Sequence, residues 1–224
     1  MTFSIVARSE DGAQFGVAIA SSSPAVAARC AHARAQVGAV ASQNITDPVL
    51  AHRTLDALAH GVPADQALRD ALASTPFGEY RQLLVVAPVG RPQIHSGAHA
   101  LGVVGSAIGR HSASAGNLLA TPLVPQVMVA AFEAADGALA ARLLCALRAG
   151  LDAGGEAGPV HSAGLLVVRD VEWPIVDLRV DWSLSDPVAD LEAAWAVYEP
   201  QVEDYVRRAQ NPVAAPRFGV PGDP

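Results

Sequence analysis

The sequence predicts an α+β fold: a four-layer αββα sandwich, in which two antiparallel sheets pack face to face and helices cover their outer sides. Short apolar segments rich in β-forming residues come in groups joined by turn signals. Helix-like segments come in pairs between those groups, whereas a single parallel sheet requires alternating strands and helices. A two-layer α+β domain is the alternative, because periodicity does not separate the two.

Length and hydropathy indicate one domain over residues 1–210, followed by a Pro- and Gly-rich tail over residues 211–224. A chain of 224 residues is long enough to bury roughly 70–75% of the surface that it exposes when unfolded. No apolar run approaches the ~20 residues of a membrane span. The N-terminus lacks the features of a signal peptide. We therefore expect a cytoplasmic protein.

Charge and cysteine content exclude several classes of function. The net charge is −7 and all 15 basic residues are arginine, so there is no basic stripe to bind nucleic acid. Cys30 and Cys145 fit no ligand spacing and are expected to be small core residues in a reducing compartment. The seven histidines are scattered, so no metal and no cofactor are predicted.

The strands follow from short apolar runs bounded by turns. Asp11-Gly12 predicts a hairpin between Phe3–Ala7 and Phe15–Ser21. A polar segment, 29–34, then precedes a third strand. The further predicted strands are Val37–Ser42, Gln82–Ala87, shorter extended pieces up to Gly116, Ser162–Val168 and Ile175–Val180.

The helices follow from caps and from apolar periodicity. Thr46-Asp47-Pro48 predicts a helix start with a hydroxyl cap, ending near Gly61, and a second helix begins at Pro63. A third helix starts at Thr121-Pro122, with Val124, Val127, Met128, Ala131 and Phe132 on its core face. Asp136 is expected to cap a fourth helix. The last begins at Asp186-Pro187 and is interrupted near Pro200.

The opening Met1-Thr2 carries the first indication of chemistry. If Met1 is removed, Thr2 supplies both a hydroxyl nucleophile and, in its α-amine, a base whose ordinary pKa is about 7.7–8.0. This is the chemistry of an N-terminal nucleophile hydrolase. The alternative is that Thr2 simply starts a strand.

Several spaced motifs resemble a widespread bacterial family of unknown function that is assigned to the N-terminal nucleophile (Ntn) hydrolase fold. The match runs in order from Met1 to about Leu191. The motifs are Met1–Ala7, Gly16–Ser21, His32–Ala35, Val37–Gln43, Ala115–Leu119, His161–Val168 and Leu178–Asp181. The resemblance implies the four-layer αββα architecture.

The resemblance also implies a site around Thr2. By analogy with better-known Ntn hydrolases, the expected catalytic residues are Thr2, Ser21, Ser42, Asn117 and Ser162, and the expected substrate-binding residues are Ser23, His32, Arg34, Gln43, Asn44 and His111. The serines are alternatively turn or strand-end hydroxyls, and Asn117 alternatively only caps backbone groups. Two departures stand out: no lysine is present, and Pro159 stands where those relatives carry an acidic residue, three positions before Ser162.

The predicted function is hydrolysis of a small amide-like C–N bond through a Thr2 acyl-enzyme, without a cofactor. A non-catalytic small-ligand-binding module on the same scaffold is the alternative. A conventional serine hydrolase using Ser21, Ser22 or Ser23 ranks last, because no Gly-x-Ser-x-Gly elbow is present. The expected partner is a small amide-like molecule, not nucleic acid or membrane, and the long C-terminal helix is compatible with a homo-oligomer.

Overall fold

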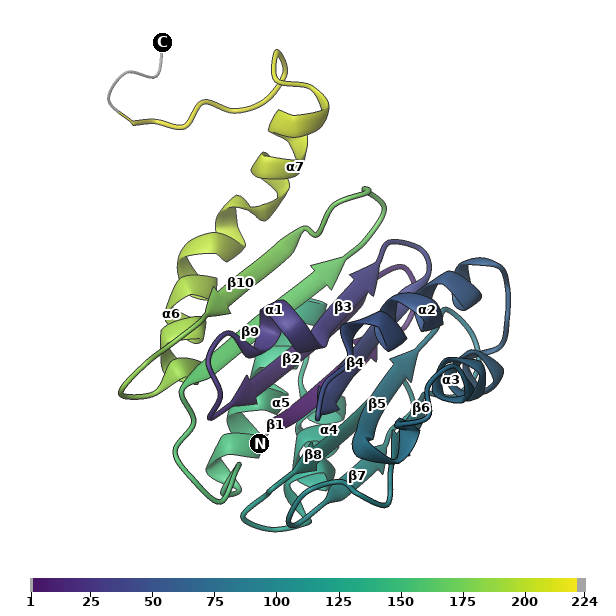
Figure 1. The fold of residues 1–224 in the computed structure, drawn as a ribbon. Helices are drawn as coiled ribbons and strands as arrows, with labels where there is room; N and C mark the ends of the chain where they lie inside the picture. The colour runs from purple at the N-terminus through teal and green to yellow at the C-terminus, as the bar shows by residue number, and fades with distance from the viewer. Residues whose placement is uncertain (1, 221–224) are drawn as a thin grey trace.

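Two antiparallel sheets form the centre of the structure, a computed structural model that describes residues 2–220 (Figure 1). The larger sheet has six strands in the order β10-β9-β2-β1-β8-β7, and the smaller has four in the order β3-β4-β5-β6. The strands of the larger sheet are β1 (Thr2–Arg8), β2 (Phe15–Ser21), β7 (Gly105–Ile108), β8 (Ser112–Asn117), β9 (Ser162–Val168) and β10 (Val176–Val180). Those of the smaller sheet are β3 (Ala31–Arg34), β4 (Gly38–Asn44), β5 (Arg81–Val86) and β6 (Gln93–Ser96).

Helices cover the outer face of each sheet. Three pack on the larger sheet: α4 (Val124–Ala134), α5 (Leu139–Asp152) and α6 (Pro187–Tyr198). Two pack on the smaller sheet: α2 (Pro48–Ala59) and α3 (Ala64–Ala73). The short α1 (Val26–Cys30) contributes to the apolar layer between the sheets. The remaining elements are η1 (Gly78–Tyr80), η2 (Glu199–Gln201) and α7 (Val202–Gln210).

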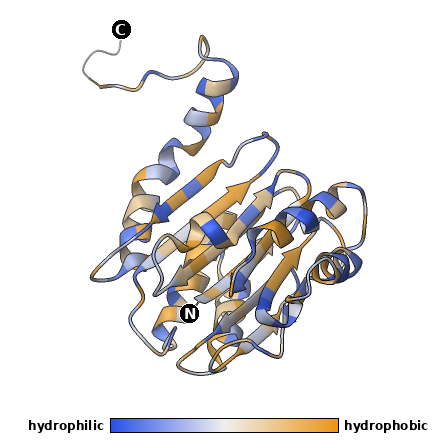
Figure 2. Cartoon of the chain, viewed as in Figure 1, coloured by the Kyte–Doolittle hydropathy of each residue, from blue (hydrophilic) through white to orange (hydrophobic). Residues whose placement is uncertain are grey.

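Three separate apolar clusters confirm the layered sandwich. One lies between the larger sheet and α4–α6, one between the two sheets, and one between the smaller sheet and α2–α3. Strand β1 contributes side chains to two of these clusters, since Phe3 and Ile5 point to the helices while Val6 points to the other sheet. The apolar colouring of the central strands against the mixed colouring of the helices shows the same layering (Figure 2).

The hairpin and the C-terminal interruption are confirmed. Residues 9–14 join β1 to β2, with Gly12 at φ +71°, a conformation that glycine adopts without strain. Asp186 caps α6 by accepting hydrogen bonds from the backbone N–H groups of Val188 and Ala189. The chain then passes through η2 into α7, which extends away from the sandwich as an arm (Figure 1).

Several local predictions were wrong. Val37–Ser42 was expected to be the third strand, but the polar segment 29–34 before it contributes to α1 and forms β3, so the expected third strand is β4. Asp47 caps α2, whereas the Thr46 hydroxyl donates to the Ser42 carbonyl. Asp136 does not cap α5, whose N-cap is Ala138.

Two predicted core residues also lie at the surface. Cys145 is exposed, in contrast to Cys30, which is buried between the sheets. Val127 is 37% exposed, because the face of α4 that packs on the sheet is centred on Val124, Met128 and Phe132.

No helix within residues 2–220 combines the length and the apolar character needed to cross a lipid bilayer.

Candidate functional site

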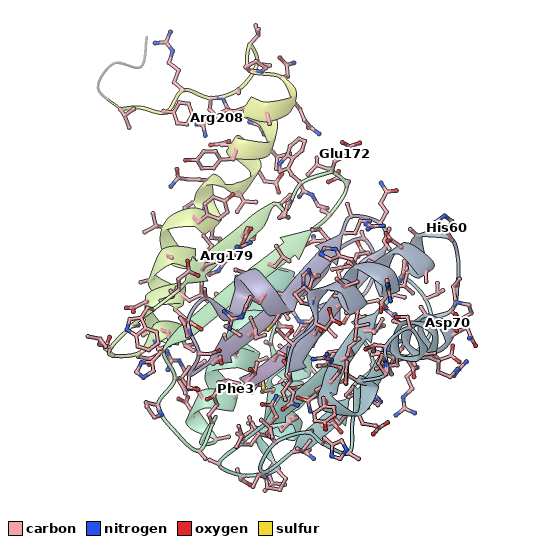
Figure 3. The ribbon with its side chains drawn as sticks, in the orientation of Figure 1. Phe3, His60, Asp70, Glu172, Arg179 and Arg208 are labelled. Carbon is pink, nitrogen blue, oxygen red and sulfur yellow. The ribbon has the colours of Figure 1, made fainter. Side chains whose placement is uncertain are left out.

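Thr2 lies at the start of β1, in the interior of the larger sheet. Strand β1 is flanked by β2 and β8, so it has no free edge. Side chains alternate along a strand, and Phe3 points to the helices, so Thr2 and Ser4 point into the space between the sheets. Thr2 is only 4% exposed. Figure 3 labels its neighbour Phe3 in the body of the molecule, far from Arg208 on the arm.

A chain of hydroxyl groups runs from Thr2 to an arginine. Thr2 Oγ1 donates to Ser21 Oγ at 3.5 Å, and Ser21 Oγ lies 2.8 Å from Ser23 Oγ. Arg29 Nη2 donates to Ser23 Oγ at 3.1 Å. Strand pairing sets this arrangement, since Ser21 ends the strand that runs antiparallel to β1. The structure therefore brings together Thr2, Ser21 and Ser23 of the predicted site.

A buried carboxylate, Glu156, completes this cluster and was missed from the sequence. Its two oxygens accept from the backbone N–H of Ser22 at 3.0 and 3.1 Å, and the residue is 4% exposed. Burial raises its pKa above the ordinary value, against opposing hydrogen bonds from Ser22 and Ser21. Glu156 stands three residues before Pro159, the position at which the resemblance leads one to expect an acidic residue.

Ser162 lies opposite Ser21 in the pairing of β9 with β2. Its hydroxyl donates to the Ser23 carbonyl at 2.6 Å and accepts from the Val26 backbone N–H at 3.3 Å. These contacts fix the turn after β2. Ser162 therefore positions the serine cluster.

Asn117 ends β8 directly opposite Thr2. Its Nδ2 donates to Gln82 Oε1 at 3.1 Å, and Gln43 Nε2 donates to the same oxygen at 2.8 Å. Ser4 Oγ in turn donates to Gln43 Oε1 at 2.7 Å. Asn117 Oδ1 is buried and accepts from no donor within residues 2–220. A layer of amides between the sheets thus holds Asn117 beside Thr2.

The three predicted site residues at the end of β4, Ser42, Gln43 and Asn44, form hydrogen bonds with groups other than Thr2. Ser42 points away from Thr2, to the α2 side, and its hydroxyl donates to the Asp47 carbonyl. The Gln43 amide serves the layer just described. Asn44 holds a loop, because its Nδ2 donates to the Tyr80 carbonyl and its Oδ1 accepts from Leu101 N–H.

His32 and Arg34 lie on the outer face of the smaller sheet. His32 makes an edge contact with the ring of His52 on α2, and Arg34 pairs with Asp56 at 2.8 Å. Burial lowers the pKa of His32. The arginine that joins the Thr2 cluster is Arg29.

His111 lies at the opposite end of β1, because its carbonyl accepts from Arg8 N–H. Six residues of extended chain separate Thr2 from Arg8, about 20 Å. Burial and the nearby arginines lower the pKa of His111. The structure therefore does not bring His111 to Thr2.

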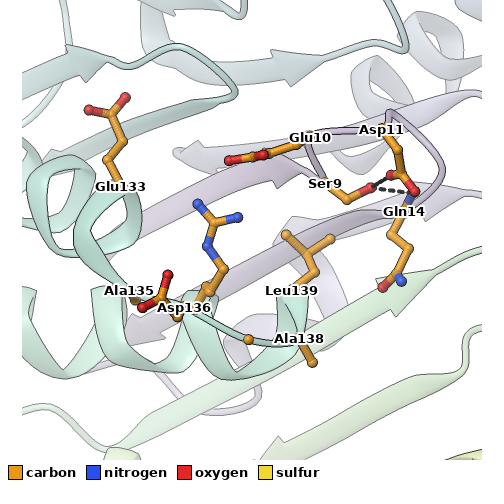
Figure 4. A pocket seen from close by; sticks show the side chains of 11 residues that line it. Ser9, Glu10, Asp11, Gln14, Glu133, Ala135, Asp136, Ala138 and Leu139 are labelled. Carbon is orange, nitrogen blue, oxygen red and sulfur yellow. Dashed lines mark hydrogen bonds between the residues drawn. The ribbon is translucent and has the colours of Figure 1, made fainter.

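A cavity of about 480 Å³ opens at that far end of β1 (Figure 4). Its lining is largely acidic, with Glu10, Asp11, Glu133 and Asp136 around Arg142. The guanidinium of Arg142 stacks on the Phe132 ring at 4.3 Å and donates to the Phe132 carbonyl. This cavity and the hydroxyl cluster are thus separate.

The fold and site define a two-sheet sandwich with a buried threonine, three serines and a carboxylate at the head of a central strand. The chain belongs to the family of unknown function DUF1028, whose model matches residues 2–191. No curated protein matches the chain in sequence.

Two solved structures were compared. Protein SPO2555 from Silicibacter pomeroyi, of the same family, superposes with a TM-score of 0.84 at 27% identity, covering 92% of this chain and 94% of that one. Anbu, an ancestral β-subunit from Yersinia bercovieri, gives a TM-score of 0.39 at 12% identity, covering 92% and 97%. The second likeness is too weak to bear on the fold or on the function.

Proposed function

We propose that the protein is an N-terminal nucleophile hydrolase that cleaves a small amide-like C–N bond, acting in the cytoplasm. The observation that supports it most directly is the position of Thr2. It is a buried hydroxyl residue at the start of the chain, and its Oγ1 lies 3.5 Å from Ser21 Oγ. Loss of Met1 would place a free α-amine beside that hydroxyl, which supplies the base that a threonine nucleophile needs.

The reaction would proceed in two steps. Thr2 Oγ1 attacks the carbonyl carbon, its proton passes to the neutral α-amine, and the tetrahedral intermediate collapses as the C–N bond breaks. The α-ammonium then protonates the leaving nitrogen. In the second step the amine activates water, which attacks the ester and releases the acid and free Thr2.

The neighbouring residues have distinct proposed roles. Ser21 accepts from the Thr2 hydroxyl in the resting site and is a proton-relay candidate. Asn117 presents its amide beside Thr2, and Ser162 holds the turn that carries Ser23. Ser42 is left without a role in this proposal, because its hydroxyl is bonded to the Asp47 carbonyl on the other face of the sheet.

Intact mass followed by an activity screen tests the proposal. We expect the purified protein to lack one methionine, and to hydrolyse a member of a panel of small amides and imides. Thr2→Ala should abolish turnover and Thr2→Ser should retain part of it, since only serine keeps a hydroxyl. Turnover preserved in Thr2→Ala would exclude Thr2 as the nucleophile.

A non-catalytic ligand-binding module is the second candidate. It is favoured by the absence of lysine from the whole sequence. Within residues 2–220, Arg29 is the cation whose hydrogen bonds reach the cluster, and a guanidinium does not deprotonate at neutral pH. Retention of Met1, together with calorimetric binding of an amide that is not turned over, would support this candidate instead.

A further inference from the structure

Within the described residues, two buried groups near the head of β1 lack a partner of the kind they usually have: the Asn117 amide oxygen has no donor, and the Glu156 carboxylate has no cationic side chain. Asn117 Oδ1 lies in a side chain with no exposed surface, and no donor in residues 2–220 reaches it. The Glu156 carboxylate is buried, yet no arginine or histidine of the described chain lies within 4.0 Å of it. Buried acceptors and charges are normally paired, because leaving them unpaired is costly.

Strand geometry directs the nitrogen of Thr2 toward the backbone of Asn117, the residue whose side chain carries the first acceptor. Arg8 N–H donates to the His111 carbonyl, which makes that pair a hydrogen-bonded pair of the β1–β8 ladder. Hydrogen-bonded pairs recur at every second residue of an antiparallel ladder. Thr2 is six residues from Arg8 and is paired with Asn117, so its nitrogen faces β8.

Two sets of contacts place the second group, the Glu156 carboxylate, near the head of β1. Beyond Asn117 the chain bridges to Glu156 through Leu119, and the N–H of Ala157 donates to the Leu118 carbonyl. From the other side, Glu156 binds the backbone of Ser22, next to the serine that contacts Thr2 Oγ1. Asn117 and Glu156 therefore flank the head of β1.

We propose that Asn117 Oδ1 and the Glu156 carboxylate bind the α-amine that methionine removal creates at Thr2, and we call these two groups the seat of the amine. A primary ammonium offers three donors, where the peptide nitrogen of an unprocessed chain offers one. Glu156 is then a positioning residue that holds the amine beside Oγ1 and shares a proton with it. This inference rests on the proposed N-terminal threonine, but not on turnover.

The other ionisable groups near this seat are few. Arg29 reaches the cluster through Ser23. His161 lies behind it: its backbone N–H donates to the Ser21 carbonyl, and its Nδ1 bonds the Ser183 carbonyl at 2.8 Å. The α-amine and Glu156 are accordingly the two groups whose titrations are most directly linked.

The test is the pKa of the α-amine in protein that begins at Thr2, measured by competitive acetylation of the N-terminus across pH. A carboxylate within about 4–6 Å favours the charged form of an amine. Glu156→Gln should therefore lower the measured pKa by about 1 or more. Glutamine keeps the side-chain shape and an oxygen for Ser22 N–H.

The matched control is Glu133→Gln at the far cavity. Glu133 also accepts from a backbone N–H, that of Arg110, at 2.8 Å. This variant should leave the α-amine pKa unchanged. An equal pKa in wild type and Glu156→Gln would overturn the proposal.

Two further measurements separate this inference from the proposed function. Thr2→Ala keeps the α-amine but has no hydroxyl, so the effect of Glu156→Gln on the amine should persist in that background even if no hydrolysis is ever found. If Glu156→Gln does not fold, a crystal structure of the wild-type protein beginning at Thr2 decides. An α-nitrogen farther than 4.0 Å from the Glu156 carboxylate and out of hydrogen-bond reach of Asn117 Oδ1 would exclude the seat.

Discussion

The two ends of β1 differ in kind. At the Thr2 end, small polar side chains are packed against one another, and Thr2, Ser21 and Glu156 are each less than 5% exposed. At the Ser9 end, a cavity of about 480 Å³ is lined by carboxylates that face solvent. The first end holds the proposed nucleophile and little room, while at the second the Ser9 hydroxyl donates to the Asp11 carboxylate at the edge of an open cavity.

The proposed site therefore lies at the end of β1 away from this cavity. At the Ser9 end, four exposed carboxylates line the cavity together with Arg142. At the Thr2 end, which we call the closed end, strand pairing brings the side chains together, because β2, β8 and β9 each place one polar side chain near the head of β1. The Ser9 end is called the open end.

The largest difference should appear in activity. Ser21→Ala removes the hydroxyl that accepts from Thr2 Oγ1, and we expect kcat/KM toward an amide substrate to fall about 10²-fold. Ser9→Ala, at the other end of β1, should leave kcat/KM within a factor of two. Steady-state kinetics of the two variants checks this. Equal losses in both would show that turnover does not depend on the Thr2 end.

The amide layer should make the closed end the less tolerant of polar loss. Gln82→Leu deprives Asn117 Nδ2 and Gln43 Nε2 of their shared acceptor, and we expect the free energy of unfolding to fall by about 2–4 kcal/mol. Gln93→Leu is the control, since the Gln93 amide bonds only the nearby Arg91 carbonyl. Urea denaturation of both measures it. A loss below 1 kcal/mol in Gln82→Leu would contradict the expectation.

The carboxylates of the two ends should respond to pH in opposite directions. In protein that keeps Met1, burial raises the pKa of Glu156, so the folded state holds that proton more tightly than the unfolded state. Its contribution to stability is present below the unfolded pKa and is lost as pH rises through the folded pKa. A glutamine does not titrate, so Glu156→Gln does not lose this contribution. The Tm of the variant should therefore rise relative to that of wild type as the pH increases from 4 to 8. A difference in Tm that is constant with pH would refute this.

The smallest effect is expected at the open end. Hydrogen bonds from the Ser9 hydroxyl and the Ala13 backbone N–H lower the pKa of Asp11. Its contribution to stability is therefore present above the unfolded pKa and is lost as pH falls through the folded pKa. Asp11→Asn should lie slightly below wild type in Tm at pH 7 and approach it near pH 2. Calorimetry at the two values decides the sign.

Most of the fold was predictable because periodicity and turn chemistry are local. The hairpin at Asp11-Gly12 and the helix start at Asp186-Pro187 are written in neighbouring residues. Strand β3 was missed because alternation there uses Ala31 and Ala33 as its inward residues, and alanine gives a weak apolar signal.

The site was less predictable, because a shift of one residue on a strand reverses the face. Gln43 points between the sheets while Ser42 points to α2, and His32 follows the same rule on β3. Glu156 stands in a glycine-rich stretch with no periodicity. Contacts with residues distant in the sequence, among them the bridge to Leu119 and the bond to Ser22, bring it to the head of β1.

The interior position of β1 has a consequence for timing during synthesis. The strand pairs with β2 at once, but its other neighbour ends at Asn117, so the sheet cannot close around Thr2 until that residue has been made. At about 5–20 residues per second this takes roughly 6–23 s. An aminopeptidase that removes Met1 would have to act before the sheet closes, so maturation of the proposed nucleophile would depend on the relative rates of methionine removal and folding.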